Sequence, residues 1–378
     1  MNKKIFDTII IGGGISGLSC ARHLQKHKED FLLISKDLGG RILTSEDRTV
    51  NYGAFFVCSD YNYVLNHVKI HSQIKLRDFC FHDNNDKYVL FEPIFLTYSF
   101  QFLKVIKILY KFRKALRKFR KNSETNSQKN AIESDPFLKE LYMKNAFNLV
   151  KEYNIESGTN KYLSKALYST TFSKVEDMNA FSFLQFLLPL ITHIYTFTFE
   201  KEKMIKPFQE KIYLDCVKNI KYNDNKYTIK NNKKMYYSKN LVLATDIGFS
   251  KHFAGISKTN KPVSTTMLHI KGSPKNIIRR KKYQLFCYPN NVQAIANLED
   301  GSYLLYYKFK MPKLDKYFSK YQIISQHFWD PAGTINGHNL IECNRGNNLY
   351  LIGDCNVAGL EESYITGLYA AKQILNNK

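Results

Sequence analysis

Short apolar runs alternate with a helical pattern at the start of the chain. Residues 5–11 form an isoleucine-rich run of strand length, and residues 17–27 follow with Leu18, Ala21 and Leu24 at helical spacing. A second apolar run, "FLLIS", begins at Phe31. This order predicts a strand, a helix and a second strand, a unit typical of doubly wound α/β folds.

Strand patterns return in the second half of the chain. Residues 211–245 contain three short β segments separated by the polar turns "YNDNK" and "KNNKK". Further strands are predicted over residues 263–270 and 302–309. The chain closes with the run "NLYLIGD", which predicts a strand, and with a helix over residues 363–375.

A basic amphipathic helix is predicted over residues 100–121, because apolar residues recur at helical spacing opposite nine Lys and Arg residues. The predicted apolar stripe consists of Leu103, Ile106, Leu109, Phe112, Leu116 and Phe119. Residues 93–121 contain no acidic residue, so the helix favours either a membrane interface or packing on the protein with a solvated basic face. The polar residues 121–135 predict a loop.

Residues 178–199 carry no Lys, Arg, Asp or Glu, which raises the question of a membrane span. Pro189 divides this stretch, and Asn179, Gln185 and His193 interrupt it. We therefore expect buried protein core here and no transmembrane helix.

The composition limits which binding partners and which cellular compartment are expected. A formal net charge of +23 predicts attraction to anionic surfaces, and of these a membrane surface is retained and nucleic acid is not expected. The seven cysteines are scattered without a C-x-x-C pair, which indicates a reducing compartment. We expect a cytoplasmic location, with peripheral membrane attachment as an open alternative. The ten histidines show no metal-ligand spacing, so no metal site is expected.

The glycine motif "GGGISG" lies between the first strand and the first helix. Gly12 permits a tight turn, Gly14 lets the backbone approach a pyrophosphate, and Gly17 lets helix and strand pack closely. The anion would lie at the helix N-terminus. The motif alone does not separate NAD from FAD.

A glycine doublet follows the second strand. The segment "LGGRI" places Gly39, Gly40 and Arg41 where amides and a guanidinium reach another part of the same dinucleotide. The alternative is an ordinary turn with a solvated arginine.

At these residues the chain resembles the FAD-dependent amine oxidase superfamily, which includes protoporphyrinogen oxidases, carotenoid desaturases and polyamine oxidases. "GGGISGLSCARHL" and "LGGRI" match its two N-terminal motifs, and "VNYGAFFV" is similar to its third, with Asn51 in place of the usual acid. "IYLDCVKNIKYNDNKYTI" and "NLVLATD" resemble its middle strands. "NLYLIGDCNVAGLEESYITGLYAAKQIL" resembles its closing flavin motif.

The resemblance implies FAD as a non-covalent cofactor. The residues implied to bind it are Gly12, Gly14, Ile15, Ser16, Gly17, Ser35, Lys36, Gly39, Gly40, Arg41, Val217, Gly353, Asp354, Ser363 and Tyr364. Ser35 stands where the family has a glutamate for the adenosine ribose, so the charge-assisted bond at that position is missing. Trp329 and His338 are the candidates for side chains near the flavin ring, and each has a structural role as its alternative.

The resemblance also implies a doubly wound, Rossmann-like FAD domain with an interleaved α+β substrate domain. The predicted FAD domain combines residues 1–90, 205–255 and 336–378, and residues 91–204 and 256–335 form the predicted substrate domain. The predicted activity is oxidation of an amine or of a lipophilic, polyunsaturated small molecule by hydride transfer to FAD. Two alternatives stay open. A non-redox flavoprotein mutase is disfavoured by Arg41, and a membrane-surface binding protein on a degenerate flavin scaffold is suggested by the charge and by Ser35.

Overall fold

The computed structural model describes residues 4–83, 86–231 and 234–377. Its first sheet is seven-stranded, with the order β8-β2-β1-β11-β10-β9 and with β17 paired to β11. The strands are β1 (Ile5–Gly14), β2 (Phe31–Gly39), β8 (Ile212–Leu214), β9 (Asn219–Asn223), β10 (Lys226–Lys230), β11 (Met235–Leu243) and β17 (Leu349–Leu351). The strands β8, β2, β1, β11 and β17 pair in parallel. The predicted first βαβ unit and the closing strand are thus confirmed.

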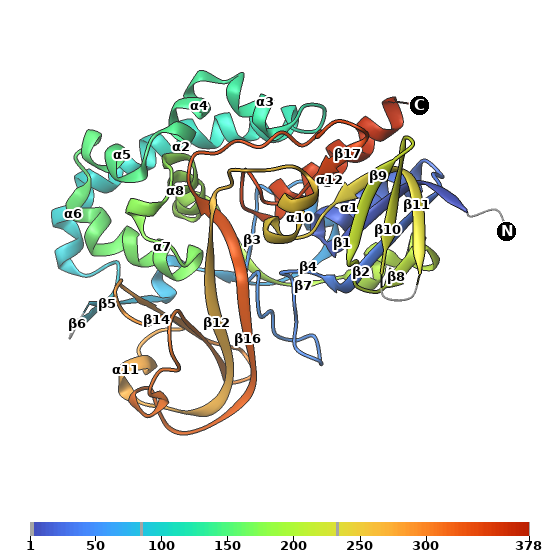
Figure 1. The fold of residues 1–378 in the computed structure, drawn as a ribbon. Coiled ribbons are helices and arrows are strands. Elements are labelled where there is room, and N and C mark those ends of the chain that lie inside the picture. The colour runs from blue at the N-terminus through green and yellow to red at the C-terminus, as the bar shows by residue number, and fades with distance from the viewer. Residues whose placement is uncertain (1–3, 84–85, 232–233, 378) are drawn as a thin grey trace.

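Both faces of the first sheet are covered, which explains why β1 is a nearly continuous apolar run. Ile10 packs into a core with the helices α1 (Ile15–Lys26) and α12 (Leu360–Asn376). Ile9 and Ile11, on the other face, pack with α10 (Ile247–Phe253) and with β10. Figure 1 shows α1 and α12 side by side near both chain termini.

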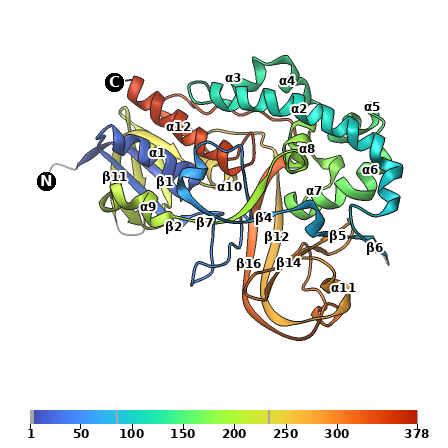
Figure 2. The same ribbon diagram turned by 180° about the vertical axis from the view of Figure 1, so that it is seen from behind.

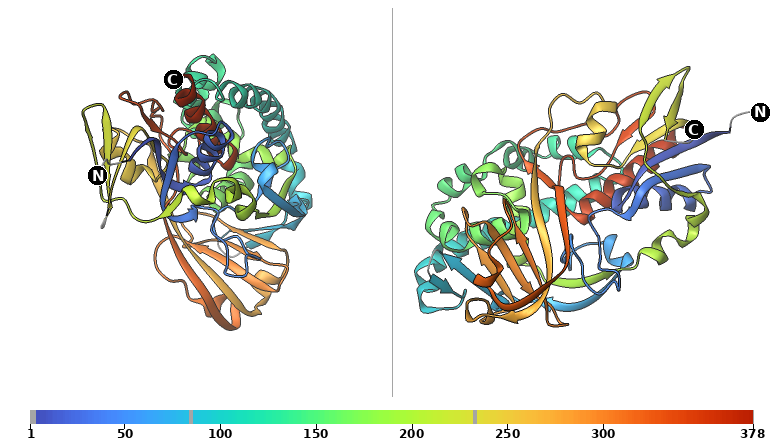
Figure 3. Two further views of the ribbon diagram at one scale, coloured as in Figure 1. Left: turned by 90° about the vertical axis from the view of Figure 1, so that its right-hand side faces the viewer. Right: turned by 60° about the horizontal axis from the view of Figure 1, so that its bottom comes forward.

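A second sheet, also seven-stranded, has the order β16-β12-β15-β14-β13-β5-β6. Its strands are β5 (Phe79–Asp83), β6 (Asp86–Tyr88), β12 (Lys261–Pro274), β13 (Tyr283–Phe286), β14 (Val292–Asn297), β15 (Ser302–Tyr307) and β16 (Phe318–Asn336). The long pair β12 and β16 curves below the rest of the molecule (Figure 3). A small third sheet joins β3 (Val57–Cys58), β7 (Ile194–Phe199) and β4 (Val68–Ile74).

The predicted division into two domains stays a prediction. One detail differs from it, because β5 and β6 belong to the second sheet, whereas residues 1–90 are all assigned to the predicted FAD domain. The reason is a parallel pairing of β5 with β13 between residues that lie about two hundred positions apart, such as Cys80 and Gln284. No local pattern in the sequence indicates such a pairing.

The helices that lie between β6 and β7 in the chain pack together into a layer of their own. They are α2 (Ser99–Asn122), α3 (Gln128–Glu133), α4 (Pro136–Met143), α5 (Ala146–Glu152), α6 (Glu156–Gly158), α7 (Ser164–Thr171) and α8 (Ala180–Leu187). Short helices α9 (Lys201–Ile205) and α11 (Asn276–Arg279) lie elsewhere in the chain. The prediction of a loop over residues 121–135 is wrong in part, because α3 lies within these residues. Ser127 caps α3 by accepting from the amide of Asn130, and Ile132 is buried.

The predicted basic helix exists as α2, but its buried face is partly different from the predicted stripe. Leu109, Phe112, Leu116 and Phe119 are buried as expected, whereas Leu103 is 62% exposed. In the first turns Phe102, Val105 and Ile108 are buried instead. The cause is an aromatic cluster around Tyr162, against which Phe102 packs and which rotates the buried face at this end of the helix.

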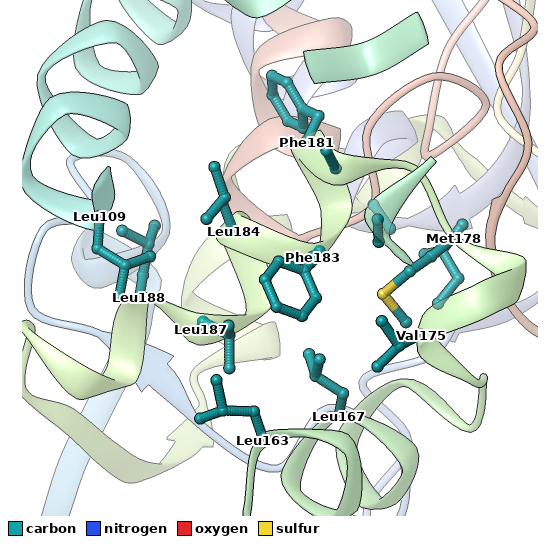
Figure 4. Close-up of a cluster of buried hydrophobic side chains, with 14 of the residues drawn as sticks. Leu109, Leu163, Leu167, Val175, Met178, Phe181, Phe183, Leu184, Leu187 and Leu188 are labelled. Carbon is teal, nitrogen blue, oxygen red and sulfur yellow. The ribbon is translucent and has the colours of Figure 1, made fainter. Parts of the chain in front are cut away.

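The uncharged stretch 178–199 forms core, as predicted. Phe183, Leu184 and Leu187 on α8 pack with Leu109 of α2 and with Leu167 of α7 (Figure 4). The stretch continues into β7. Within residues 4–83, 86–231 and 234–377, no helix combines the length and the apolar character that a membrane crossing requires.

Candidate functional site

The glycine turn at the end of β1 is the starting point of the site. Gly12 has a φ of +112°, and a Cβ placed there would lie 2.5 Å from the carbonyl oxygen of Ala244. A Cβ on Gly17 would lie 2.0 Å from the carbonyl oxygen of Gly12. A Cβ on Gly14, in contrast, would meet no atom within 4 Å. The turn is therefore closed toward the sheet and open at Gly14.

Helix α1 begins directly at this opening. Its N-cap residue is Gly14, no side chain caps its first amides, and its first turn, which contains Ile15, Ser16 and Gly17, carries no acid. The first amides of a helix are unsatisfied donors at the positive end of the helix dipole. An anion is the natural partner for this helix end.

The glycine doublet lies on the turn, as predicted. Gly39 pairs with Gly14 across β2 and β1, and a Cβ on Gly40 would lie only 3.0 Å from the Cα of Gly14. Gly39 and Gly40 have φ values of +110° and +56°. Two side-chain-free residues are therefore needed for the second junction to rest against the first.

Arg41 and Asp354 meet at this edge of the first sheet, although they lie at opposite ends of the chain. The Nη1 atom of Arg41 donates to Oδ2 of Asp354 at 2.5 Å and to the carbonyl oxygen of Ala332 at 3.3 Å. Burial raises the pKa of the Asp354 carboxyl, but the charge and hydrogen bond of Arg41 outweigh burial and lower it overall. Asp354 is therefore an anion at neutral pH.

Ser35 is already engaged within the protein. Its hydroxyl accepts from the amide of Gly13 at 2.8 Å and donates to the carbonyl oxygen of Asp37 at 2.6 Å. The hydroxyl thus stabilises the glycine turn itself, while the neighbouring Lys36 side chain is exposed. A cofactor contact of Ser35 or Lys36 stays a prediction.

The remaining predicted cofactor residues are distributed around this edge. Val217 is buried against Ile11 and Ile34 on one face of the first sheet. Gly353, with a φ of +124°, donates its amide to the hydroxyl of Thr366 on α12.

The predicted residues on α12 are buried, but the ring of Tyr364 has other neighbours. Ser363 is 6% exposed and Tyr364 is 8% exposed. The carbonyl oxygen of Tyr364 accepts from the Ser19 hydroxyl on α1, whereas its ring stacks on Tyr63 and His67. Neither ring partner is a predicted cofactor residue, so the Tyr364 ring serves the protein core.

Trp329 lies beside the doublet, whereas His338 does not. The indole Cζ2 of Trp329 lies 3.1 Å from the Cβ position of Gly53, a position that is also 2.1 Å from the carbonyl oxygen of Arg41. Trp329 is 8% exposed, and its Nε1–H has no hydrogen-bond acceptor among the described residues. His338 contacts the carbonyl oxygen of Tyr142 through Nδ1 at 2.7 Å.

Further aromatic residues surround Trp329 that the sequence pattern did not indicate. The His327 ring lies 4.1 Å from the Trp329 ring, centroid to centroid, and the hydroxyl of Tyr306 donates to the carbonyl oxygen of Tyr52 at 3.0 Å. Thr265 and Met267 of β12 pair with Trp329 and His327 of β16. These residues come together only through the second sheet, so spacing along the chain gives no signal for them.

Comparisons with known proteins agree with this site. A family model described as an NAD(P)-binding Rossmann-like domain matches residues 10–69. Flavin-containing amine oxidase A from Equus caballus is 44% identical over 54 residues, which is 14% of this chain and 10% of that protein. The corresponding protein from Canis lupus familiaris is 46% identical over 50 residues, covering 13% of this chain and 10% of that protein. The matched region thus spans about a tenth of the length of these relatives.

Solved structures extend the likeness to the whole fold. Putrescine oxidase bound to putrescine has a TM-score of 0.68 at 10% identity, covering 99% of this chain and 100% of that chain. A fatty acid isomerase from P. acnes has a TM-score of 0.65 at 14% identity, with 98% of both chains covered. Cyclohexylamine oxidase from Brevibacterium oxydans has a TM-score of 0.64 at 12% identity, covering 99% of this chain and 98% of that chain. The predicted resemblance to the amine oxidase superfamily is confirmed, in sequence over a stretch of 50 to 54 residues and in fold over the chain.

Proposed function

We propose that this protein is an FAD-dependent oxidoreductase. The observation that carries the proposal is the meeting of an open glycine turn, an uncapped helix N-terminus and the guanidinium of Arg41 at one edge of the sheet. A flavin dinucleotide presents a pyrophosphate with two negative charges, and these three groups match it in charge and in donor type. The flavin amine oxidase relatives support the same cofactor.

The residues present fit FAD at two places, the pyrophosphate and the adenine end. Gly14, the first amides of α1 and Arg41 would hold the pyrophosphate. Gly14 has no side chain, so the space beside it is open to the phosphates. Val217 would contact the adenine end. When bound, the flavin ring supplies two-electron redox chemistry, and the protein supplies binding and orientation.

The buried indole of Trp329 gives the site a second polar feature. A buried N–H without an acceptor is costly, and such groups in native proteins are satisfied by a ligand or by ordered water. We assign the Trp329 N–H to a bound ligand, with His327 and Tyr306 as its aromatic surroundings.

The proposed substrate is an apolar amine or another lipophilic small molecule. Thr265, Met267, Tyr306, His327 and Trp329 are all uncharged or aromatic, so they offer no counter-charge to a second ammonium group. A short diamine would leave one cation without a partner, which is unfavourable in a buried site. An anionic membrane surface is the second proposed partner, at another face of the molecule.

Isomerisation of a lipophilic substrate is the second candidate function. It is favoured by one observation, the full-length likeness to a fatty acid isomerase. Net oxidation of substrate separates the two functions, because an oxidoreductase leaves the flavin reduced in the absence of oxygen and an isomerase leaves it oxidised.

The test is the visible spectrum of the purified protein, followed by anaerobic addition of an apolar amine and of putrescine. We expect a yellow protein that the apolar amine bleaches faster than putrescine does. Gly14→Val should be folded and colourless, since its side chain enters open space in the pyrophosphate path. A colourless native protein that takes up no FAD would reject the proposal.

A further inference from the structure

Exposed apolar side chains gather on one short stretch of the chain. This stretch comprises the end of the loop after β6, the 3-10 helix η3 (Pro93–Tyr98) and the first turns of α2. The exposed fractions are 73% for Leu96, 69% for Phe100 and 65% for Phe91. We call this set the apolar patch, and it consists of Phe91, Ile94, Leu96, Phe100 and Leu103. Single exposed apolar residues are ordinary, but five within thirteen positions are not.

The apolar patch is held rigidly on the protein. Phe95, Tyr98 and Phe102 lie between the patch residues in the chain and turn the opposite way, each with its ring centroid 5.8 Å from that of Tyr162. Tyr162 is 1% exposed. Because these inward contacts fix the backbone of η3 and α2, the alternate residues are directed away from the core. The packing of these rings on Tyr162 thus keeps the patch residues exposed.

Cationic side chains continue the same face of α2. Lys107, Lys111 and Lys114 are exposed and follow Phe100 and Leu103 at helical spacing. The basic face is smaller than the sequence predicts, since Arg113 turns inward to Asp60 at 3.5 Å and Arg120 is buried. The exposed face of α2 therefore carries apolar residues in its first turns and three lysines after them.

A second group of cations flanks the other side of the patch. The residues from Arg279 to Lys282 form a basic run, and Arg280 pairs with Glu92 at 2.5 Å, next to Phe91. That pair neutralises the acid nearest the patch. The other acids on neighbouring elements include Asp86 on β6, which is exposed, and Glu156 on α6, which is half-buried. Figures 1 and 2 place α6, β6 and α11 together at the end of the molecule away from both termini.

We propose that the apolar patch, with its two cationic flanks, binds the surface of an anionic lipid bilayer. Apolar side chains would enter the boundary between headgroups and acyl chains, while the lysines would stay at headgroup level with the anionic phosphates. A second copy of the chain fits less well, because two faces carrying the same cations would repel and the whole chain has a net charge of +23.

The test is co-sedimentation of the full-length protein with vesicles of phosphatidylcholine that contain or lack phosphatidylglycerol. The native protein should bind the anionic vesicles and bind less at high salt. The patch variant Leu96→Gln, Phe100→Gln, Leu103→Gln should bind about tenfold more weakly, because burial of three large side chains is lost. Its control is Leu214→Gln, Met235→Gln, Phe309→Gln, which changes three other exposed apolar residues.

A charge variant separates the two contributions. Lys107→Gln, Lys111→Gln, Lys114→Gln should lower binding and reduce its salt dependence, whereas Lys26→Gln, Lys28→Gln, Lys206→Gln should not. Equal thermal unfolding of all variants shows that they are folded, as expected for exposed positions. Equal binding by the patch variant and its control, or no binding by the native protein, would overturn the proposal. So would self-association of the native chain that the patch variant abolishes without any vesicle binding.

Discussion

Two of the ion pairs that involve the closing segment of the chain have different surroundings. Arg41 and Asp354 meet at 2.5 Å beside the glycine turn, with 38% of the Arg41 side chain exposed. Arg120 of α2 and Glu362 of α12 meet at 2.8 Å, with 4% and 0% of their side chains exposed. The first pair is open toward the proposed ligand, and the second is closed in the core.

The closed pair belongs to a balanced cluster. Asp60 lies 3.6 Å from Arg120 and 3.5 Å from Arg113, so two cations face two anions, and the cluster joins α2 to α12. The neighbouring Glu361 accepts backbone amides from Asn62, Tyr63 and Val64. A buried charge is tolerated only with such partners, so this cluster serves the fold. Arg41, being partly exposed, can turn toward an incoming anion at little cost, which suits a ligand-binding role.

The largest expected effect comes from opening the closed cluster. Arg120→Met leaves Glu362 without its counter-charge in the core and leaves Asp60 with Arg113, and it should lower the free energy of unfolding by about 3–5 kcal/mol. Urea unfolding measures this change. Arg117→Met, on the exposed side of the same helix, is the control and should change it by less than about 0.5 kcal/mol. Equal losses in both variants would show that the cluster has no special role.

Removing the cation of the open pair should act mainly on the cofactor. Arg41→Met should raise the dissociation constant for FAD about ten- to hundredfold, because a charge-assisted hydrogen bond to a phosphate is lost. The free energy of unfolding without FAD should also fall, by about 1–3 kcal/mol, because the mostly buried Asp354 carboxylate loses its counter-charge. Lys26→Met, at the other end of α1, controls for the loss of one positive charge. Titration of the apoprotein with FAD, followed by flavin fluorescence, gives both constants.

Both members of the open pair were predicted from the sequence as cofactor residues, although their pairing was not, and the closed pair was not predicted at all. Arg41 and Asp354 both stand next to glycine motifs whose spacing is local, so each could be recognised within a few residues of chain. Arg120 lies 242 residues from Glu362, and its place in a basic helix indicated a solvated or membrane-facing side chain. Trp329 was a candidate on position alone. Its aromatic neighbours depend on the pairing of β12 with β16, which the sequence pattern does not reveal.

Low pH should remove the stability that the open pair contributes. Arg41 lowers the pKa of Asp354 in the folded protein, so the pair adds stability above the pKa of an unfolded aspartate, about 3.9. That stability is lost as the pH falls through the folded pKa. Asp354→Asn should therefore differ from the native protein at pH 7, and the difference should shrink as the pH falls through and below the folded pKa of Asp354, in the free energy of unfolding measured at each pH. Asp224→Asn, at an exposed acid, is the control and should show a smaller difference at pH 7. A constant difference at all pH values would indicate that packing, and not charge, makes Asp354 matter.

The smallest expected effect on stability concerns Trp329, the buried polar group that belongs to neither pair. Phenylalanine removes the Nε1–H, which has no acceptor among the described residues, and it also removes part of the ring. Relief of an unsatisfied donor, worth about 1–3 kcal/mol, opposes the packing lost with the smaller ring, so the free energy of unfolding should hardly change. If the N–H serves a ligand, Trp329→Phe should raise the KM for the apolar amine about tenfold while the flavin content stays unchanged. Trp329→Leu, which also loses the aromatic face, should raise it further. A Trp329→Phe protein with native KM and lowered stability would place Trp329 in the core alone, and the polar groups directed at a ligand would then be Arg41 and the first amides of α1.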